Sequence, residues 1–164
     1  MMKPEAVSGS REVTIDAKIN GSSVHVIVPS KFTLAELLRE KLDLTGTKLG
    51  CNRAECGVCT VLLDGTPVFS CTVLAAEVNG RKVETVEGML QGERLHPLQQ
   101  AFVKEDALQC GFCTPGLLMT LEALTNKVER PTLQQVKDAI AGNYCRCGAY
   151  PNIFKAALEA AQAR

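Results

Sequence analysis

The chain carries no net charge, since 18 basic residues balance 18 acidic ones over 164 positions. A clustered basic surface is the electrostatic footprint of nucleic-acid binding, and this composition gives no such bias. The sequence also lacks any apolar run approaching the roughly 18–20 residues that cross a bilayer. These two absences argue against nucleic acid and against direct membrane insertion.

Common catalytic patterns are absent as well. The chain has no glycine-rich phosphate loop and no serine–histidine–aspartate set, so no substrate chemistry is expected on it. Its two histidines, His25 and His96, have no second histidine placed as a co-ligand, which argues against a Rieske-type centre. His25 is expected to be structural within a strand. His96 precedes a proline and is expected to be a helix cap or a surface residue.

The N-terminal segment has neither the apolar stretch of a signal peptide nor a twin-arginine pair, which indicates a cytoplasmic protein. Residues 1–10 are small and polar and are expected to form a flexible tail. In a reducing compartment, cysteines at metal-ligand spacing are more often ligands than disulfide partners. This context matters because the chain contains eight cysteines.

The eight cysteines fall into two blocks of four. The first block, Cys51-x4-Cys56-x2-Cys59 followed by Cys71, has the spacing of a plant-type [2Fe–2S] cluster. Glycines beside these cysteines let backbone N–H groups approach the cluster sulfurs, and such hydrogen bonds help to set its potential. The first block therefore predicts an iron–sulfur centre.

The second block combines Cys110-x2-Cys113 with Cys145-x-Cys147 further along the chain. Each pair precedes a predicted helix, where the helix dipole and free N–H groups favour anionic thiolates. Four thiolates also suit a structural zinc site, so zinc is an alternative here. The Cys-x-Cys pair and the neighbouring ferredoxin-type set favour iron, and two such centres would move single electrons.

The apolar pattern predicts an α+β fold. Alternation of apolar and polar residues predicts strands, and the Asn20-Gly21 and Asp64-Gly65 dipeptides predict tight hairpin turns. Thr33 and Glu36 predict a capped helix packed across the first hairpin. The expected strands cover residues 13–19, 24–28, 61–63, 68–71 and 83–86.

After Gly88 the pattern changes to short helices with faces rich in alanine and leucine, which predict a four-helix bundle. The expected helices cover residues 96–103, 115–124, 132–141 and 151–163. We therefore divide the chain into residues 1–10 as a tail, 11–87 as a ferredoxin-type domain and 88–164 as a helical domain.

Three motifs resemble the iron–sulfur subunit of the molybdenum hydroxylases. That family includes xanthine dehydrogenases, aldehyde oxidoreductases, carbon monoxide dehydrogenases and hydroxybenzoyl-CoA reductases. The motifs are GCNRAECGVCTVLLDG with Cys71, QCGFCTPG at 109–116 and GNYCRCGAYPNI at 142–153. The resemblance covers nearly the whole chain and implies a plant-ferredoxin-like β-grasp domain followed by a four-helix domain.

The resemblance also implies two [2Fe–2S] clusters and their partners. Electrons would run from molybdopterin on a large subunit, through both clusters, to FAD on a medium subunit, within a hetero-oligomer such as a dimer of heterotrimers. Gln109, otherwise read as a helix C-terminal residue, would contact the molybdopterin, and Cys147 would lie close to it. The implied ligands are Cys51, Cys56, Cys59 and Cys71 for the flavin-proximal cluster, and Cys110, Cys113, Cys145 and Cys147 for the molybdenum-proximal cluster.

One departure from the family pattern is visible. Residues 145–150 read CRCGAY, whereas many members have CRCTGY, so the ligands are kept while the positions beside the implied pterin contact differ. Arg146 within this segment would pair with cluster charge, contact a partner or form a surface salt bridge. Two other function classes remain as alternatives: a stand-alone ferredoxin-like carrier and a zinc-stapled interaction module.

Overall fold

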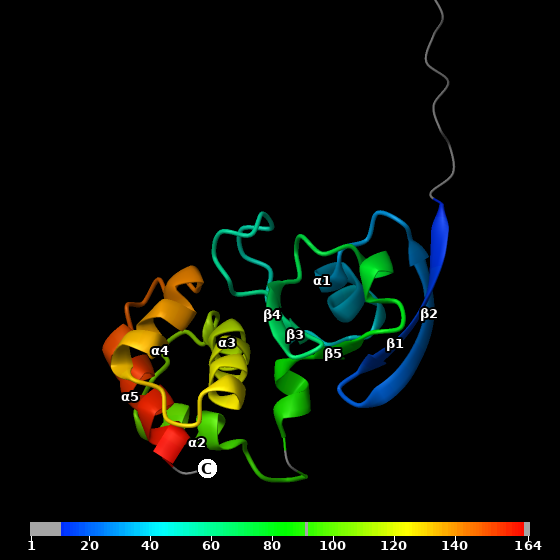
Figure 1. Ribbon diagram of the computed structural model, residues 1–164. Coiled ribbons are helices and arrows are strands. Elements are labelled where there is room, and N and C mark those ends of the chain that lie inside the picture. The colour runs from blue at the N-terminus through cyan, green and yellow to red at the C-terminus, as the bar shows by residue number, and fades with distance from the viewer. Residues whose placement is uncertain (1–10, 91, 163–164) are drawn as a thin grey trace, which may run out of the picture.

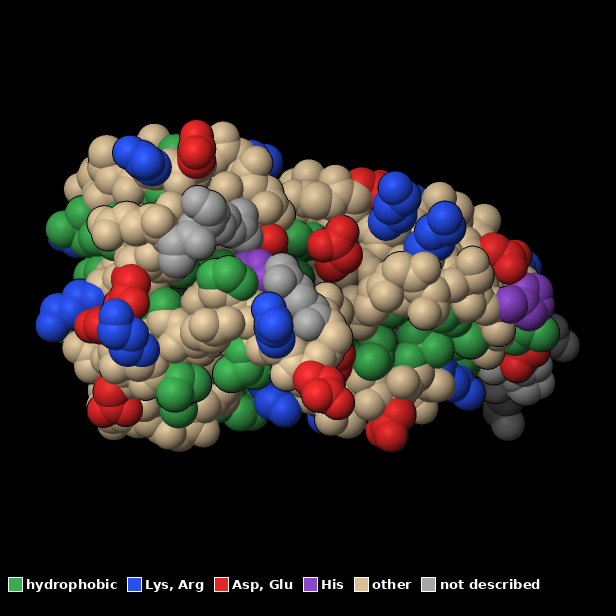
Figure 2. Space-filling model, turned by 90° about the horizontal axis from the view of Figure 1, so that it is seen from below, with side chains coloured by type: hydrophobic (Ala, Val, Ile, Leu, Met, Phe, Trp, Pro, Cys, Tyr) green, Lys and Arg blue, Asp and Glu red, His purple; other side chains and the backbone are tan. Residues whose placement is uncertain are grey.

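The computed structural model describes residues 11–90 and 92–162, so the expected tail, residues 1–10, lies outside the described residues. A five-stranded sheet occupies one half of the molecule and helices occupy the other (Figure 1). This is the α+β fold that the sequence predicts. On the face seen in Figure 2, acidic and basic side chains of the described residues are interspersed.

The sheet is mixed and is built from two hairpins with one strand between them. Its strands are β1 (Glu12–Ile19), β2 (Ser22–Pro29), β3 (Thr60–Leu63), β4 (Thr66–Phe69) and β5 (Lys82–Glu84), in the order β2-β1-β5-β3-β4. β5 is parallel to β1 and antiparallel to β3. The predicted turns are present: φ is 50° and 81° at Asn20-Gly21 and 49° and 76° at Asp64-Gly65, as type I′ geometry requires.

A helical segment packs across the sheet, beginning as α1 (Leu34–Glu36) and continuing as the π-helical η1 (Leu37–Lys41). The predicted capping box is present, because Glu36 N donates to Thr33 Oγ1 at 3.2 Å and Thr33 N donates to Glu36 Oε2 at 2.7 Å. The π-helical half was not expected from the sequence. Its consecutive Leu37 and Leu38 both lie in the core, where they are 1% and 0% exposed.

Two strand ends differ from the prediction. β4 ends at Phe69, so Cys71 lies two residues beyond the strand, in a turn. β5 ends at Glu84, because Val86–Met89 turn into the 3-10 helix η3. In both places the strand is shorter than predicted because a turn with polar contacts follows it.

A polar network centred on the buried Thr85 ties the end of β5 to the first hairpin. Thr85 is 0% exposed, its Oγ1 accepts from Asn20 Nδ2 at 2.9 Å, and its N–H donates to Asn20 Oδ1 at 2.8 Å. Thr85 Oγ1 also donates to Glu87 Oε2, while Glu87 Oε1 accepts from Gly46 N at 2.7 Å. The network thereby anchors the loop that leads to the first cysteine block.

Replacing Thr85 with valine is expected to lower the free energy of unfolding by about 1–3 kcal/mol, because it leaves the half-buried Asn20 and Glu87 groups without their partner. Urea denaturation of the purified chain would measure the change. Thr66→Val is the control, since this threonine is exposed on β4. A loss no larger than that of the control would contradict the stabilising role of the network.

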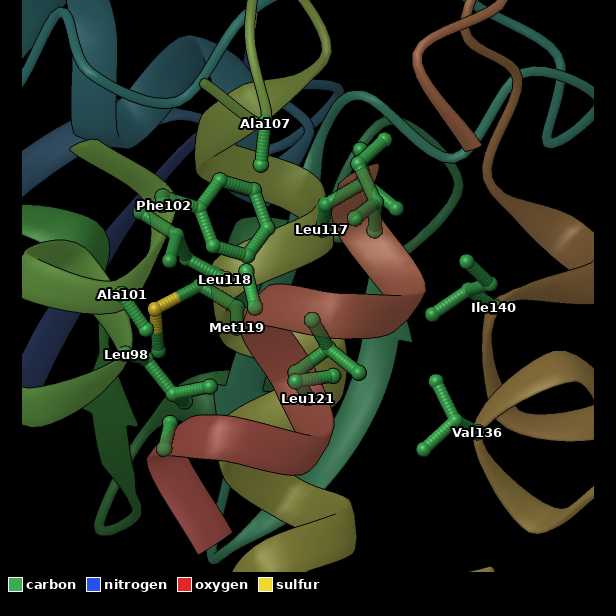
Figure 3. Close-up of a cluster of buried hydrophobic side chains, with 14 of the residues drawn as sticks. Leu98, Ala101, Phe102, Ala107, Leu117, Leu118, Met119, Leu121, Val136 and Ile140 are labelled. Atoms are coloured by element: carbon green, nitrogen blue, oxygen red, sulfur yellow. The ribbon is translucent and has the colours of Figure 1, made fainter. Parts of the chain in front are cut away.

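The second half of the chain contains α2 (Pro97–Lys104), α3 (Thr114–Lys127), α4 (Leu133–Ala139), the 3-10 turn η4 (Ile140–Gly142) and α5 (Tyr150–Gln162). The four α-helices correspond to the predicted ones, with ends that differ by one to three residues. Their apolar side chains, among them Phe102, Leu117 and Val136, form one core (Figure 3). No helix in the described part of the chain is long and apolar enough to cross a membrane.

His96 caps α2, since its Nδ1 accepts from Leu98 N at 3.3 Å. The cap prediction is confirmed, but the surface alternative is wrong because His96 is only 7% exposed. His25 lies in β2 as expected, exposed and within 2.7 Å of Asp16 Oδ1.

The sheet and the helices share an apolar core. α3 packs against β3, and Leu62 of β3 is buried in the same cluster as Leu117 and Leu121 of α3. The loop of residues 50–59 reaches from the sheet toward the helices (Figure 1). The position of this loop decides how the two cysteine blocks lie relative to each other.

Candidate metal centres

The structure places cysteines of each predicted set in close pairs, and all eight are free thiols. The first set lies in the irregular loop between η1 and β3 and in the turn after β4. The second set lies in the loops that precede α3 and α5. The predicted helix-terminal position is clearest for Cys113, which is the N-cap residue of α3.

Backbone N–H groups surround the sulfurs of the first set. Cys51 Sγ accepts from Glu55 N at 3.2 Å and from Cys56 N at 3.4 Å, and Cys71 Sγ accepts from Ala54 N at 3.4 Å. The loop can aim these donors inward because Ala54 has a positive φ of 60°. Such donors stabilise negative charge on sulfur.

The thiols of the first set differ in pKa because some are exposed to backbone N–H donors and others are buried. The backbone N–H of Arg53, helped by those of Glu55 and Cys56, lowers the pKa of the Cys51 thiol to about 7. Burial, reinforced by the adjacent Cys71 thiol, raises the pKa of the Cys59 thiol to about 11. Cys59 is only 2% exposed, so its thiolate is stable only beside a cation.

In the second set the pKa of an exposed thiol is likewise lowered and that of a more buried thiol is raised. The backbone N–H of Phe112 and then the Cys147 thiol lower the pKa of the exposed Cys110 thiol. Burial, followed by the Cys145 thiol, raises the pKa of the Cys113 thiol to about 12. Each set therefore combines an outer thiol held by N–H donors with an inner thiol that suits a metal ligand.

The thiols of each set lie in two close pairs. The pairs are Cys51 with Cys56, Cys59 with Cys71, Cys110 with Cys147, and Cys113 with Cys145. Among the described residues, no three His, Cys, Asp or Glu side chains are placed to share one metal ion. A zinc site needs four ligands around one centre, whereas each of the two irons of a [2Fe–2S] cluster takes two protein ligands. The arrangement of the thiols fits the binuclear cluster.

The two ligand loops touch each other. Tyr144 N donates to Cys56 O at 2.9 Å, which joins the residue before Cys145 to a cysteine of the first set. On the same side, a Cβ built on Gly50 would lie 3.7 Å from the Phe112 ring. Both candidate centres therefore lie along the junction of sheet and helices.

The structure does not place Gln109 at a helix C-terminus, and it does not place Arg146 in a surface salt bridge. Gln109 is exposed in a bend beyond the end of α2 at Lys104, so it is not a helix C-terminal residue. Arg146 is exposed and its Nη1 donates to Tyr144 Oη at 2.9 Å rather than to a carboxylate. Gln109 remains adjacent to Cys110, as the family motif requires.

The unusual Gly148-Ala149 pair also has a structural setting. Gly148 has a φ of 73°, which glycine adopts without strain. Ala149 is 7% exposed and packs in the helical core. The departure from the family pattern is therefore compatible with the turn that leads from Cys147 into α5.

Two residues of the second site were missed from the sequence. Tyr150 Oη accepts from Cys145 N at 2.8 Å and donates to Asn143 O at 3.1 Å, which clamps the loop before the last cysteine pair. Asn143 is buried, and its amide reaches the first cysteine loop. Their only sequence signal was their position beside the Cys-Arg-Cys motif.

Two family models match the chain in succession. A 2Fe-2S iron-sulfur cluster binding domain matches residues 17–88, and a [2Fe-2S] binding domain matches residues 85–158.

Individual proteins are similar over almost the full length. The chain is 47% identical over 153 residues to the nicotine 6-hydroxylase small subunit of Paenarthrobacter nicotinovorans, which covers 93% of this chain and 92% of that protein. It is 43% identical over 152 residues to the xanthine dehydrogenase iron-sulfur-binding subunit of Escherichia coli O157:H7, covering 92% and 95%. The crystal structure of quinoline 2-oxidoreductase from Pseudomonas putida 86 matches with a TM-score of 0.91 and 43% identity, covering 94% of this chain and 96% of that one.

Proposed function

Because this chain belongs to the iron–sulfur small subunits of molybdenum hydroxylases, we propose that it relays electrons from molybdopterin on a large partner subunit to FAD on a medium one. A [2Fe–2S] cluster, when bound, takes up and releases one electron at a time. The observation that carries the proposal is the arrangement of eight thiols as two sets, each in two close pairs.

In this proposal the paired thiols are the cluster ligands. One cluster is held by Cys51, Cys56, Cys59 and Cys71, and the other by Cys110, Cys113, Cys145 and Cys147. The backbone N–H groups of Glu55, Cys56 and Ala54 stabilise the negative charge of the first site. The buried Cys59 and the half-buried Cys113 shield one side of each cluster from water.

The outer sides of both loops are open to partners. At the second site, Cys110 is exposed, Phe112 two residues later is 46% exposed, and Tyr144, the residue before Cys145, is 50% exposed. Exposed aromatic side chains are enriched at protein interfaces, which supports this side as the one facing the molybdopterin subunit. At the first site, Asn52 and Arg53 are exposed on the loop that would face the flavin subunit.

The proposal includes the assembly around the chain. The small subunit would work inside a hetero-oligomer, such as a dimer of heterotrimers, in the cytoplasm. The β-grasp domain would span residues 11–87, and the four-helix domain would span 88–164. The common core of α2, α3, α4 and α5 supports the second assignment.

Metal analysis tests the function directly. The purified chain is expected to hold about four iron atoms and about four labile sulfides, two of each per cluster. A protein that contains only zinc, and is colourless and redox-silent, would overturn the proposal. Copurification separates the remaining alternatives, because a stable complex with a large molybdenum subunit supports a fixed relay rather than a stand-alone carrier.

Gln109→Ala is expected to leave both clusters intact and to lower turnover of the assembled enzyme, because in this proposal the Gln109 side chain contacts the pterin. Iron content and substrate-driven reduction of the assembled complex would be measured together. Gln134→Ala is the matched control, since Gln134 is exposed on α4 and bonds only to Asp138 within that helix. Turnover equal to that of the control would remove Gln109 from the site.

A further inference from the structure

A buried side-chain amide joins the two ligand loops. Asn143 is 4% exposed and lies two residues before Cys145. Its Nδ2 donates to Gly57 O at 2.9 Å and lies 3.4 Å from Thr60 Oγ1, while its Oδ1 accepts from Thr120 Oγ1 at 3.0 Å. One amide therefore bonds the turn between Cys56 and Cys59 on one side and α3 on the other.

The backbone on either side of this amide is fixed as well. Tyr144 N donates to Cys56 O at 2.9 Å, and Tyr150 Oη accepts from Cys145 N at 2.8 Å while donating to Asn143 O at 3.1 Å. The segment 143–145 thus has bonds to the first cysteine loop and to the start of α5. Few degrees of freedom remain at the point where the two sites meet.

Close backbone contacts further restrict the positions of these segments. A Cβ built on Gly57 would lie 2.3 Å from Gly142 O, and a Cβ built on Gly116 would lie 2.4 Å from Gly57 O. The turn between Cys56 and Cys59 is therefore in direct contact with both η4 and α3. A shift of any one of these three backbone segments would therefore displace the other two.

We propose that Asn143 is a positioning residue for electron transfer between the two clusters, because its amide fixes the Cys145 loop against the Cys56–Cys59 turn. This rests on the proposed function, in which both cysteine sets hold clusters. The step moves one electron: the donor cluster is oxidised, the acceptor cluster is reduced, and no bond forms or breaks. Apolar contacts can bury a loop. An amide whose N–H and C=O groups are both hydrogen-bonded also fixes the distance and orientation between the two segments that it joins.

The test uses the full-length chain with both clusters. Asn143→Ala removes the amide, and Asn143→Asp removes the donor to Gly57 O while keeping an acceptor for Thr120. Thr120→Val is a milder variant that keeps Asn143 and removes one of its bonds. Thr125→Val is the control, because Thr125 is also buried on α3 but bonds only to the Leu121 and Glu122 carbonyls of its own helix.

The readouts are iron content, the magnetic splitting between the two reduced clusters in EPR, and the rate of electron equilibration between them after a reducing pulse. We expect both Asn143 variants to keep both signals, to lose splitting and to slow equilibration several-fold, with a smaller effect in Thr120→Val and none in the control. If Asn143→Ala fails to retain its clusters, Thr120→Val decides.

Two results would overturn the inference in different ways. Wild-type splitting and rate in Asn143→Asp and Thr120→Val would show that the amide does not position the clusters. A wild-type chain without iron would overturn the proposed function itself, and the inference with it. Iron-replete variants with altered splitting support both.

Discussion

Replacing Cys59 with serine is expected to halve the iron content of the chain, from about four atoms to about two, and to leave the second cluster in place. Cys59 is 2% exposed, and its thiol lies against that of Cys71. A buried serine hydroxyl keeps its proton far more strongly than a thiol, so the site loses an anionic ligand. The thiols of the other set are supplied by different loops and remain paired.

Metal analysis together with EPR of the reduced protein would measure this outcome. Cys147→Ser is the reciprocal variant, since its loss would remove the other signal and spare the first. Each single variant should also lack the magnetic splitting, because that requires two reduced clusters. Loss of both signals in a protein that stays folded would show that the clusters do not assemble independently.

The features predicted correctly are those that neighbouring residues determine. Asn20-Gly21 and Asp64-Gly65 form tight turns because their backbones accept positive φ angles. The Thr33 capping box depends on residues three positions apart. Short spacing likewise places Cys110 with Cys113, and Cys145 with Cys147, on one loop each. The close pairs Cys110–Cys147 and Cys113–Cys145, however, join separate loops and depend on the fold.

The features missed depend on contacts between distant segments. The bond from Asn143 to Gly57 joins residues 86 positions apart, and nothing in either local sequence indicates it. His96 was assigned a cap correctly, but its burial depends on helices that pack around it later in the chain. The π-helical turn at Leu37–Lys41, whose Leu37 and Leu38 are both buried in the core, also has no local signal in the sequence. In each case tertiary packing overrides a reasonable local expectation.

Gly57→Ala is expected to be strongly destabilising, lowering the free energy of unfolding by about 2–5 kcal/mol. Two costs add at this position. Gly57 has a φ of 66°, a conformation that penalises any Cβ by about 1–2 kcal/mol. The new methyl would also lie 2.3 Å from Gly142 O, a backbone atom that cannot rotate away.

Gly65→Ala separates these two costs. Gly65 has a similar φ of 76°, but a Cβ there would meet nothing within 4 Å. It should therefore show only the conformational penalty of about 1–2 kcal/mol. Urea denaturation of both variants would give the difference, which measures the contact between the first cysteine loop and η4.

Equal losses of unfolding free energy in the two variants would show that the first cysteine loop and η4 can separate without cost. That result would contradict a tight contact between them. A larger loss in Gly57→Ala, in chains that still bind iron, would show that backbone contact between residues 57 and 142 stabilises the fold as a whole. The same contact would then set the spacing of the two clusters, since Gly57 lies between Cys56 and Cys59 and residue 142 lies three positions before Cys145.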